Sequence, residues 1–424
     1  MKLTKRNGLL AAAALSASTL LLVTGCSSGG GGGDSGNKEI TIGVLTTDTG
    51  TYAFGMDETK AAIGAAMSNF DGDMNGGTVG DVTVKFIYEG TDGTPGSAQS
   101  KVKKLVENEA VDIELGPLSG DAGETIAQYA TTVPEVTFVN GAASPVSMTL
   151  LGAENFYRFH GDAAMWMGGV GDYAFNELGY KNIYLLADDY SFPYDNAGGF
   201  FSEYCAAGGT ITGASWVPLG TTDYATVLTK IPENTDAVYA GLGGADAAGF
   251  LSQAVSAGLD VPLVGGSIAV DTTALGAKAD IAVAAEGMIS GSPVPGAGYD
   301  NPEWAKFNEA YAAQPNAEFD APTIFSMLYY NSVMPILNAI ESTEGDLGDN
   351  QSAFRDALSA TKWMGPTGEI TVDENNQAIV DNFIVEVVAG NDGTLTVKNV
   401  SETKGVTQES TKSYERFSSC DDLQ

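Results

Sequence analysis

The sequence predicts an α/β protein built from two similar lobes in tandem, and three observations support this prediction. Apolar runs typical of strands alternate with segments of helical spacing over residues 38–286. A strand, a loop of small residues and a helix with an acidic first turn occur at 111–130 and again at 235–254; aligning Gly116 with Gly241 gives an offset of 125 residues. The 424 residues, 43% of them hydrophobic, suffice for two domains with cores. A repeat of this length indicates domain duplication, the alternative being Gly-rich loops that recur in any α/β protein.

The first half of the pattern begins at Lys38. Strands are predicted at "EITIGVL", "VTVKFIYEG", "VDIEL" and "VTFVN". Helices are predicted at "DETKAAIGAAMSNF", which has an acidic start, and at "SAQSKVKKLVENEA", with Ser97 as its capping residue. Because single helices separate these strands, they predict βαβ units and a parallel sheet.

The same order restarts near residue 163. A helix over 163–178 leads to the strand "NIYLLADD", the loop "YSFPYDN", a helix through Tyr204, and then "TITGASWV", "YATVLTKI", "DAVYAGL" and "VPLVGGS". After Glu286 helices predominate, and Pro335 should kink or interrupt the longest of them. The tail is rich in strands and is expected to complete the two lobes, so that the chain crosses between them several times.

The N-terminus has the pattern of an export signal. Lys2, Lys5 and Arg6 precede an apolar stretch from Leu9 to Val23. The following "VTGC" resembles the lipobox of bacterial lipoprotein precursors, which implies cleavage before Cys26 and lipidation of that residue. We therefore expect a signal peptide at 1–25 and a Gly/Ser-rich tether at 26–37, with an uncleaved membrane helix as the alternative.

Charge and cysteine content exclude several functional classes. The chain has 54 acidic and 20 basic side chains, a formal charge of −34, which would repel a phosphate backbone. No residue spacing indicates a metal site, and His160 is the only histidine. Beyond Cys26, the remaining Cys205 and Cys420 are free to pair outside the cytoplasm or to stay as two isolated thiols.

The loops after the predicted strands share one chemistry. They are "TTDTGTYAFG", "GPLSGD", "NGAASP", "YSFPYDN", "GLGGAD" and "GGS". Small residues let backbone N–H groups approach a ligand, and the helix N-termini behind Asp121 and Asp246 favour an anionic group. Aromatic side chains such as Phe192 and Tyr194 would supply flat apolar walls. Two lobes that face each other with such loops predict a small-molecule cleft.

Nearly the whole chain from Lys38 resembles the extracytoplasmic solute-binding proteins of ABC importers, within them the type I, branched-chain-amino-acid-binding family. The matching segments are "ITIGVLTTDTGTYAFG", "AQSKVKKLVENEAVDIELGPLSG", "NGAASP", "DDYSFPYD", "AAEGM" and "GPTGEITVDENNQ". The resemblance implies two Rossmann-like α/β lobes with parallel-core sheets, joined by a three-crossover hinge. Lobe 1 would comprise 38–160 plus 287–365, and lobe 2 would comprise 161–286 plus 366–424. Because the last strands of this family return to the second lobe, a disulfide between Cys205 and Cys420 is expected.

The same resemblance implies a set of ligand-binding residues. Phe192 stands where the family usually has a tyrosine, and Ser267 stands where it has the acidic partner of a ligand ammonium group. These departures put an ordinary amino acid ligand in doubt, although Asp121, Asp188, Asp189 or Asp246 could compensate if they are not simply helix caps or solvated carboxylates. The full set is Tyr52, Phe54, Ser119, Gly120, Asp121, Gly141, Ala142, Ala143, Phe192, Gly243 and Ser267.

The function implied is the capture of a small polar organic solute and its delivery to a membrane permease, by a monomer anchored outside the cytoplasm by lipid alone, without cofactor, metal or nucleic acid. A ligand-sensing surface receptor with the same fold is one alternative. A hydrolase is less favoured: "GGSIA" places Ser267 as a nucleophile, but His160 precedes it, whereas an α/β-hydrolase needs its histidine downstream. The adjacent Asp188 and Asp189 would point to opposite faces of a strand, which disfavours glycosidase chemistry.

Overall fold

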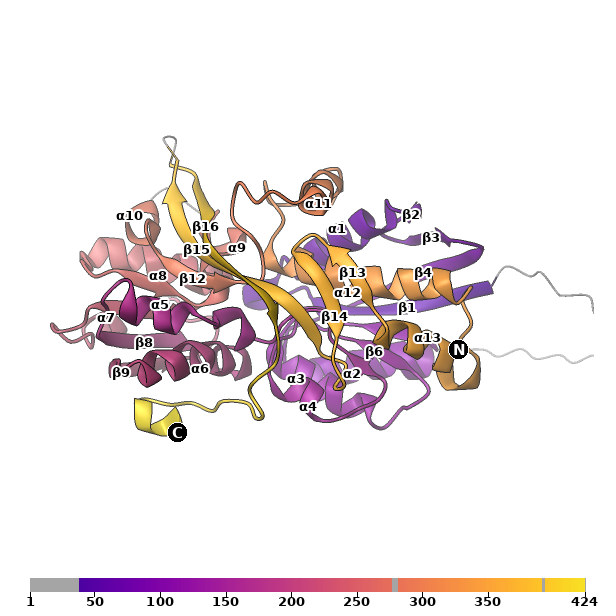
Figure 1. The fold of residues 1–424 in the computed structure, drawn as a ribbon, viewed down its shortest axis with the longest axis horizontal. Coiled ribbons are helices and arrows are strands. Elements are labelled where there is room, and N and C mark those ends of the chain that lie inside the picture. Colours follow the sequence, from indigo (N-terminus) through magenta and orange to yellow (C-terminus); the bar gives the residue numbers. More distant parts are fainter. Residues whose placement is uncertain (1–37, 277–280, 391–392, 424) are drawn as a thin grey trace, which may run out of the picture. The chain divides into compact units, whose positions relative to one another are not determined.

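Two mixed sheets form the framework of the protein. The computed structural model describes residues 38–276, 281–390 and 393–423, so the predicted signal peptide, tether and lipidated Cys26 lie outside the described residues. In the first sheet the strand order is β2-β3-β4-β1-β5-β6-β7, and β4, β1, β5, β6 and β7 pair in parallel. Figure 1 labels β1, β2, β3, β4 and β6 of this sheet. Its strands are β1 Lys38–Thr47, β2 Asp71–Asp73, β3 Gly76–Val79, β4 Val82–Thr91, β5 Ile113–Leu115, β6 Thr137–Val139 and β7 Phe156–Tyr157.

The second sheet also has a parallel core. Strands β9, β8, β10, β11 and β12 pair in parallel, while β15 joins β12, β14 and β16 in antiparallel register. Its strands are β8 Asn182–Asp188, β9 Thr210–Val217, β10 Ala237–Gly241, β11 Leu263–Gly265, β12 Ile289–Ser292, β13 Lys362–Gly365, β14 Gly368–Val372, β15 Ala378–Ala389 and β16 Leu395–Val406. The expected fold class, two α/β lobes with parallel-core sheets, is confirmed.

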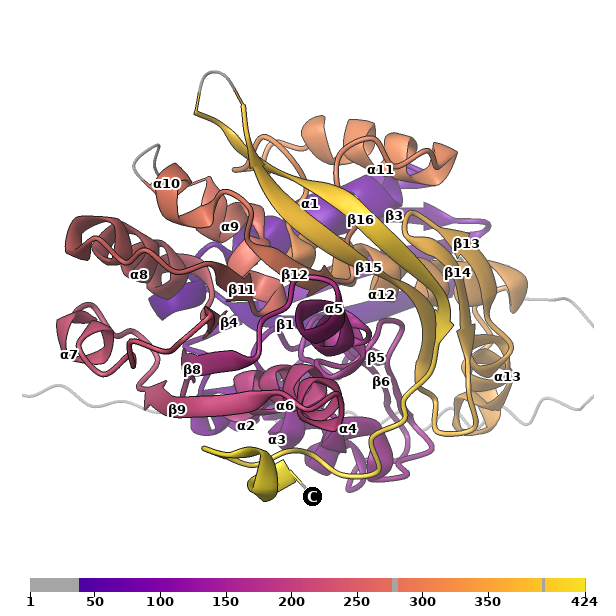
Figure 2. The same cartoon turned by 60° about the vertical axis from the view of Figure 1, so that its left-hand side comes forward.

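One expected lobe boundary differs from the structure. Strands β12 and β13 lie within 287–365, the segment expected in lobe 1, but both belong to the second sheet: β12 pairs with β11 and β15, and β13 pairs with β14. The alternation of strands and helices that is visible in the sequence ends just before β12. For this reason the sequence pattern did not assign β12 to the second sheet. The early part of β15 pairs with β14 and its later part with β12, so this one long strand connects two regions (Figure 2). The other lobe boundaries remain predictions.

Helices cover the sheets, and α12 is the most deeply buried of them. Its N-cap Thr323 and Ser326 form a reciprocal capping box, and most of its residues are buried against α1 and β3. The helix continues through Pro335, so of the two predicted outcomes the interruption is wrong and the kink stays a prediction. The helices are α1 Gly55–Met67, α2 Pro95–Lys103, α3 Gly120–Ala130, α4 Ser147–Leu150, α5 Val170–Asn176, α6 Ser191–Ala206, α7 Ala225–Leu228, α8 Gly244–Ala257, α9 Thr272–Leu275, α10 Ala282–Ala285, α11 Pro302–Ala312, α12 Ile324–Ser342 and α13 Gly348–Ser359.

Three local predictions also need correction. Helix α2 is capped by Thr94, whose hydroxyl accepts a hydrogen bond from the Ser97 N–H, so Ser97 itself is not the cap. The segment "YSFPYDN" is not a loop, because α6 begins at Ser191; Pro193 fits its first turn, where the missing N–H would have no partner within the helix. The helix predicted over 163–178 consists of a short 3-10 turn and the shorter α5.

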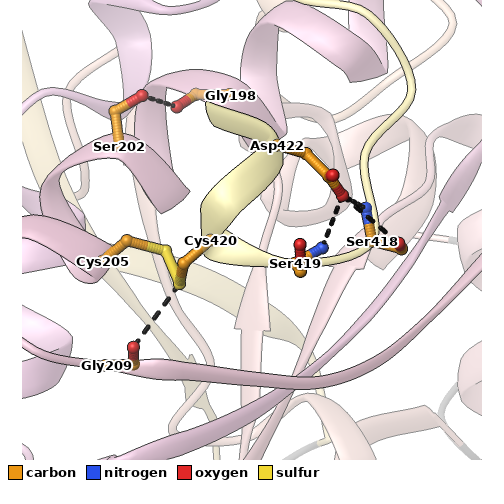
Figure 3. Close-up of a disulfide and its surroundings, with 8 residues drawn as sticks. All are labelled: Gly198, Ser202, Cys205, Gly209, Ser418, Ser419, Cys420 and Asp422. Carbon is orange, nitrogen blue, oxygen red and sulfur yellow. Dashed lines mark hydrogen bonds between the residues drawn. A yellow bond between two sulfur atoms is a disulfide. The ribbon is translucent and has the colours of Figure 1, made fainter. Parts of the chain in front are cut away.

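The C-terminal segment after β16 packs against α6 of the second lobe. The ring of Tyr414 covers Gly198, and the Phe417 carbonyl accepts a hydrogen bond from the Trp216 indole N–H at 2.8 Å. Cys420 forms a disulfide with Cys205 at the end of α6, with 5.7 Å between the two Cα atoms (Figure 3). Among the described residues, no helix has the length and apolar character needed to cross a membrane.

Replacing Cys205 by serine should lower the free energy of unfolding by roughly 3–5 kcal/mol, because the disulfide closes a long loop in the unfolded chain. Urea unfolding would measure the loss. Cys420→Ser should cause the same loss, and the double variant should add nothing to it. Mass spectrometry that detects two free thiols in protein prepared under oxidising conditions would contradict this prediction.

Candidate ligand-binding site

Residues from both lobes line a cleft where loops follow the strands of the two sheets. The space between these residues amounts to about 300 Å³, a figure that includes space open to solvent, so the lobes lie close together across the cleft. The loop after β1, the start of α3, the loop after β6 and the start of α12 face the beginning of α6 and the loop after β11. The lining residues are Tyr52, Leu118, Ser119, Gly120, Ala142, Ser144, Trp166, Tyr190, Phe192, Ile268 and Phe325.

Aromatic rings form most of the apolar wall. The rings of Tyr52 and Phe325 lie 5.6 Å apart between centroids, and those of Trp166 and Phe192 lie 5.7 Å apart. The rings of Tyr190 and Phe192 are stacked at 6.3 Å. These are ordinary spacings for aromatic pairs, so the five rings form a packed surface suited to a flat apolar group.

Two tyrosine hydroxyls join the lobes at this wall. The hydroxyl oxygens of Tyr52 and Tyr190 lie 2.9 Å apart and share a hydrogen bond. Burial raises the pKa of both phenols above the ordinary value, so both stay neutral at physiological pH. The bridge contributes hydrogen-bonding capacity to the cleft without adding charge.

The polar end of the cleft is the N-terminus of α3. Ser119 is the N-cap residue, but its hydroxyl donates a hydrogen bond to the Gly93 carbonyl at 2.6 Å and makes no capping bond to the helix. The first N–H groups of α3 therefore have no acceptor from this side chain, and Gly120 brings them to the cleft. Such a terminus carries partial positive charge and suits a carboxylate.

A second hydrogen-bond donor in the lining lacks a protein partner. The Trp166 side chain is 2% exposed, and its indole Nε1 atom has no hydrogen-bond acceptor among the described residues. No Asp, Glu, Lys, Arg or His occurs among the described residues of the lining. The site can thus offer aromatic surface and neutral donors to a ligand, but no ionised side chain as a counter-charge.

Of the eleven residues expected to bind ligand, five line this cleft: Tyr52, Ser119, Gly120, Ala142 and Phe192. The sequence reasoning missed Leu118, Ser144, Trp166, Tyr190, Ile268 and Phe325. Tyr190 is two positions from Phe192 in the quoted segment "DDYSFPYD", and was the one aromatic residue with a local signal.

The other six expected residues lie beside the lining. Phe54 packs its ring on Tyr52 and Phe325. Gly141 lies against the ring of Tyr329 on α12, Ala143 packs in the core against Gly123, and Gly243 lies near the Tyr52 hydroxyl. Ser267 is fully buried, and its hydroxyl oxygen accepts a hydrogen bond from the Asn196 amide at 3.1 Å. The sixth, Asp121, accepts a hydrogen bond from the Ser191 N–H.

The three other carboxylates considered for a ligand ammonium group have different roles. Asp189 forms an ion pair with Arg416, and Asp246 accepts a hydrogen bond from the Gly220 N–H at 2.6 Å. Burial and the nearby Asp246 raise the pKa of Asp188 well above its usual range, which favours a neutral carboxyl group. None of the three lies in the cleft lining.

The arrangement of Ser267 and His160 does not support hydrolysis. The His160 Nε2 atom lies 2.7 Å from the Asn140 amide nitrogen, and Nδ1 lies 2.8 Å from the Gly161 carbonyl oxygen. Burial lowers the pKa of His160 to about 3. The histidine and the serine are therefore each engaged by other partners. The described residues also contain no group of three or more His, Cys, Asp or Glu placed to hold a metal ion.

Behind the cleft, Glu58 joins three helices. Its carboxylate on α1 accepts hydrogen bonds from the Tyr311 hydroxyl on α11 and the Thr323 hydroxyl at the start of α12, both at 2.7 Å. Burial raises the pKa of Glu58 from 4.5 to about 7. The folded protein therefore retains a proton on this group over a pH range in which the unfolded chain releases it.

It follows that Glu58 makes the free energy of unfolding fall as the pH rises from about 4.5 to about 7, by up to about 3 kcal/mol. Glu58→Gln should remove this component. In urea unfolding, the loss of free energy of unfolding between pH 4.5 and pH 8 should then be smaller in the variant than in the parent. The exposed Glu341→Gln variant is the control and should keep the parent's difference. An unchanged difference in Glu58→Gln would show that Glu58 is ionised in the folded protein.

Two α/β lobes with a cleft between them at the carboxyl ends of their strands define a class of protein, the two-lobed solute-binding protein. Residues 39–393 match the periplasmic binding protein family, and the chain belongs to this family. It is therefore a binding protein and not an enzyme. A similar relative is Leu/Ile/Val-binding protein homolog 6 of Brucella melitensis, 25% identical over 371 residues, which span 85% of this chain and 90% of the relative.

Solved structures share the fold over most of the chain. An ABC transporter substrate-binding protein from Sphaerobacter thermophilus has a TM-score of 0.77 and 25% identity, covering 88% of this chain and 99% of that one. A solute-binding protein from Rhodopseudomonas palustris in complex with 3,4-dihydroxybenzoic acid has a TM-score of 0.78, 21% identity and the same coverage. A branched-chain amino acid-binding protein from Streptococcus pneumoniae in complex with isoleucine has a TM-score of 0.70 and 21% identity, covering 86% of this chain and 99% of that one.

Proposed function

We propose that this protein captures a small aromatic carboxylate in its cleft and delivers it to the permease of an ABC importer. The observation that carries the ligand class is the lining itself: five aromatic side chains lie around the N-terminus of α3, and no ionised side chain lies among them. The rings would enclose the apolar body of the ligand, while the helix N–H groups and the Trp166 indole N–H would bind its carboxylate.

A branched-chain amino acid is the second candidate, because relatives and solved structures of similar fold carry that name or ligand. Its ammonium group would need an acceptor, preferably a carboxylate, inside the closed cleft. Ser267 cannot supply the charge, and Asp121 accepts a hydrogen bond from the Ser191 N–H and does not line the cleft. The absence of an acidic side chain among the described lining residues therefore favours a ligand without an ammonium group.

Delivery to a permease requires that the protein stay close to the membrane, and we propose Cys26 as its lipid anchor. The support is the sequence pattern alone: an apolar stretch that ends in "VTGC", followed by a Gly/Ser-rich tether. The folded part would then lie outside the cytoplasm, attached through lipid.

A thermal-shift screen should identify the ligand class. Benzoate, 4-hydroxybenzoate, 3,4-dihydroxybenzoate, leucine and isoleucine are suitable probes, and a true ligand at a hundredfold excess over its Kd should stabilise the protein by about 2.7 kcal/mol. We expect a benzoate to raise the melting temperature and the two amino acids to leave it unchanged. The reverse order would refute the aromatic-acid proposal, and no response to any probe would refute both candidates.

Two substitutions should then locate the site. Phe192→Ala should weaken binding of the responding probe by about 1–3 kcal/mol through lost apolar burial. A side chain at Gly120 would meet Ser191 Oγ at 2.7 Å and Phe192 Cβ at 3.2 Å, so Gly120→Val should prevent closure and abolish binding. Calorimetry would measure both effects. Phe175→Ala, at a ring that packs on Tyr204 outside the lining, is the control and should bind normally. Parental affinity in both cleft variants would place the site elsewhere.

Replacing Cys26 by serine should release the protein from the membrane fraction, because the thiol that carries the lipid is lost. Cell fractionation measures the release, and circular dichroism should show an unchanged fold. Retention of the variant in the membrane would indicate an uncleaved N-terminal helix instead.

A further inference from the structure

Two of the carboxylates that reach across from one lobe to the other do so in opposite directions. A third, Asp195 on α6, accepts a hydrogen bond from the Val146 N–H of the first lobe at 2.7 Å. Asp121, on the first turn of α3, accepts a hydrogen bond from the backbone N–H of Ser191 at 3.1 Å. Asp271, at the start of α9 in the second lobe, accepts one from the backbone N–H of Ile324 at 2.7 Å. In the pair formed by the Asp121 and Asp271 contacts, each lobe provides one acceptor and one donor.

Both donors belong to the first turns of long helices. Helix α6 begins at Ser191, and its N-cap Tyr190 provides no side-chain cap, so the carboxylate from the other lobe acts as a cap. Ile324 is the first residue of α12, and Asp271 lies nearly fully buried against it. A carboxylate at a helix N-terminus satisfies an otherwise unpaired N–H group and interacts favourably with the helix dipole.

The two contacts flank the cleft. Asp121 follows the lining residue Gly120, and its partner Ser191 precedes the lining residue Phe192. Ile324 precedes the lining residue Phe325. Neither carboxylate belongs to the lining, so their roles differ from that of a ligand contact.

From this geometry we propose that Asp121 and Asp271 are positioning residues that latch the two lobes in the closed arrangement. The inference rests on the proposed function, in which the lobes close on a solute. Opening the cleft separates each carboxylate from its N–H group, so both contacts form and break in the same closure equilibrium. The latches therefore set the energy of closure, while the cleft lining selects the ligand.

Hydrogen–deuterium exchange of the unliganded full chain tests the latch. Mass spectrometry with fragmentation that resolves single amides would follow Ser191 and Ile324 in the parent and in Asp121→Asn, which keeps the shape but loses the charge. We expect exchange at both amides to rise by about tenfold, the factor for weakening one charge-assisted hydrogen bond. The decisive amide is Ile324, which Asp121 does not touch. Faster exchange at Ser191 alone would show that Asp121 only caps the N-terminus of α6, and would overturn the proposal.

The reciprocal variant and a control complete the test. Asp271→Asn should raise the exchange rate of the Ser191 amide. Because Asp271 also caps α9 through the Thr273 N–H, this exchange rate is interpreted only if the melting temperature shows that the variant is folded. Asp223→Asn removes the charge from an exposed carboxylate that accepts a hydrogen bond from the Ala225 N–H within the second lobe. It should change exchange near Ala225 and leave Ser191 and Ile324 at the parental rates.

The result does not depend on the ligand screen. If no probe binds but exchange rises at both amides, the latch holds and the proposed function fails. If a probe binds but exchange rises only locally, the function holds and the latch fails.

Discussion

The arrangement of this protein depends on one constraint: the first N–H groups of a helix need acceptors from outside the helix. Parallel sheets bring helix N-termini to the edge where strands end, and here the edges of two lobes face each other. The N-terminus of α6 is capped from the other lobe by Asp121, and that of α12 by its own capping box together with Asp271. The N-terminus of α3 has no side-chain cap from Ser119 and opens into the cleft. Two of the three termini stabilise the protein itself, and the third is left for a ligand.

The same constraint is consistent with the anion site that we propose in so acidic a chain. Basic side chains would supply charge, but they would also need desolvation and partners inside a closed cleft. Backbone N–H groups supply partial positive charge at no such cost, and aromatic rings exclude water around them. Near the cleft, Asp121 and Asp271 each accept a hydrogen bond from a helix N-terminus, which offsets part of their charge, and burial favours the neutral form of Glu58.

The fold was predictable because its evidence is local: strands, Gly-rich loops and acidic helix starts each occupy a few consecutive residues. About half of the residues that line the cleft could not be predicted from the sequence. Phe325 lies on a helix that the sequence predicts, but only the packing of α12 against α1 turns its N-terminus toward the cleft. Trp166 falls in a segment predicted as an ordinary helix, and its indole reaches the cleft through contacts with Phe192. Asp121 was identified as a first-turn residue of α3, yet no spacing in the sequence shows that the N-terminus of another helix lies opposite it.

The pairing of β12 with β15 has a consequence for how the protein is made. These neighbours in one sheet are separated along the chain by α11, α12 and α13, and α12 belongs to the core around the first sheet. As the polypeptide emerges in order from its N-terminus, the second sheet must wait for β15, which arrives only after a central helix of the other lobe. A fragment ending after β12 would expose a strand edge that normally lies inside a sheet, and such edges are prone to pair with other chains. Neither lobe is thus continuous in the sequence, and a chain that lacks its last strands exposes more surface for self-association than the complete one.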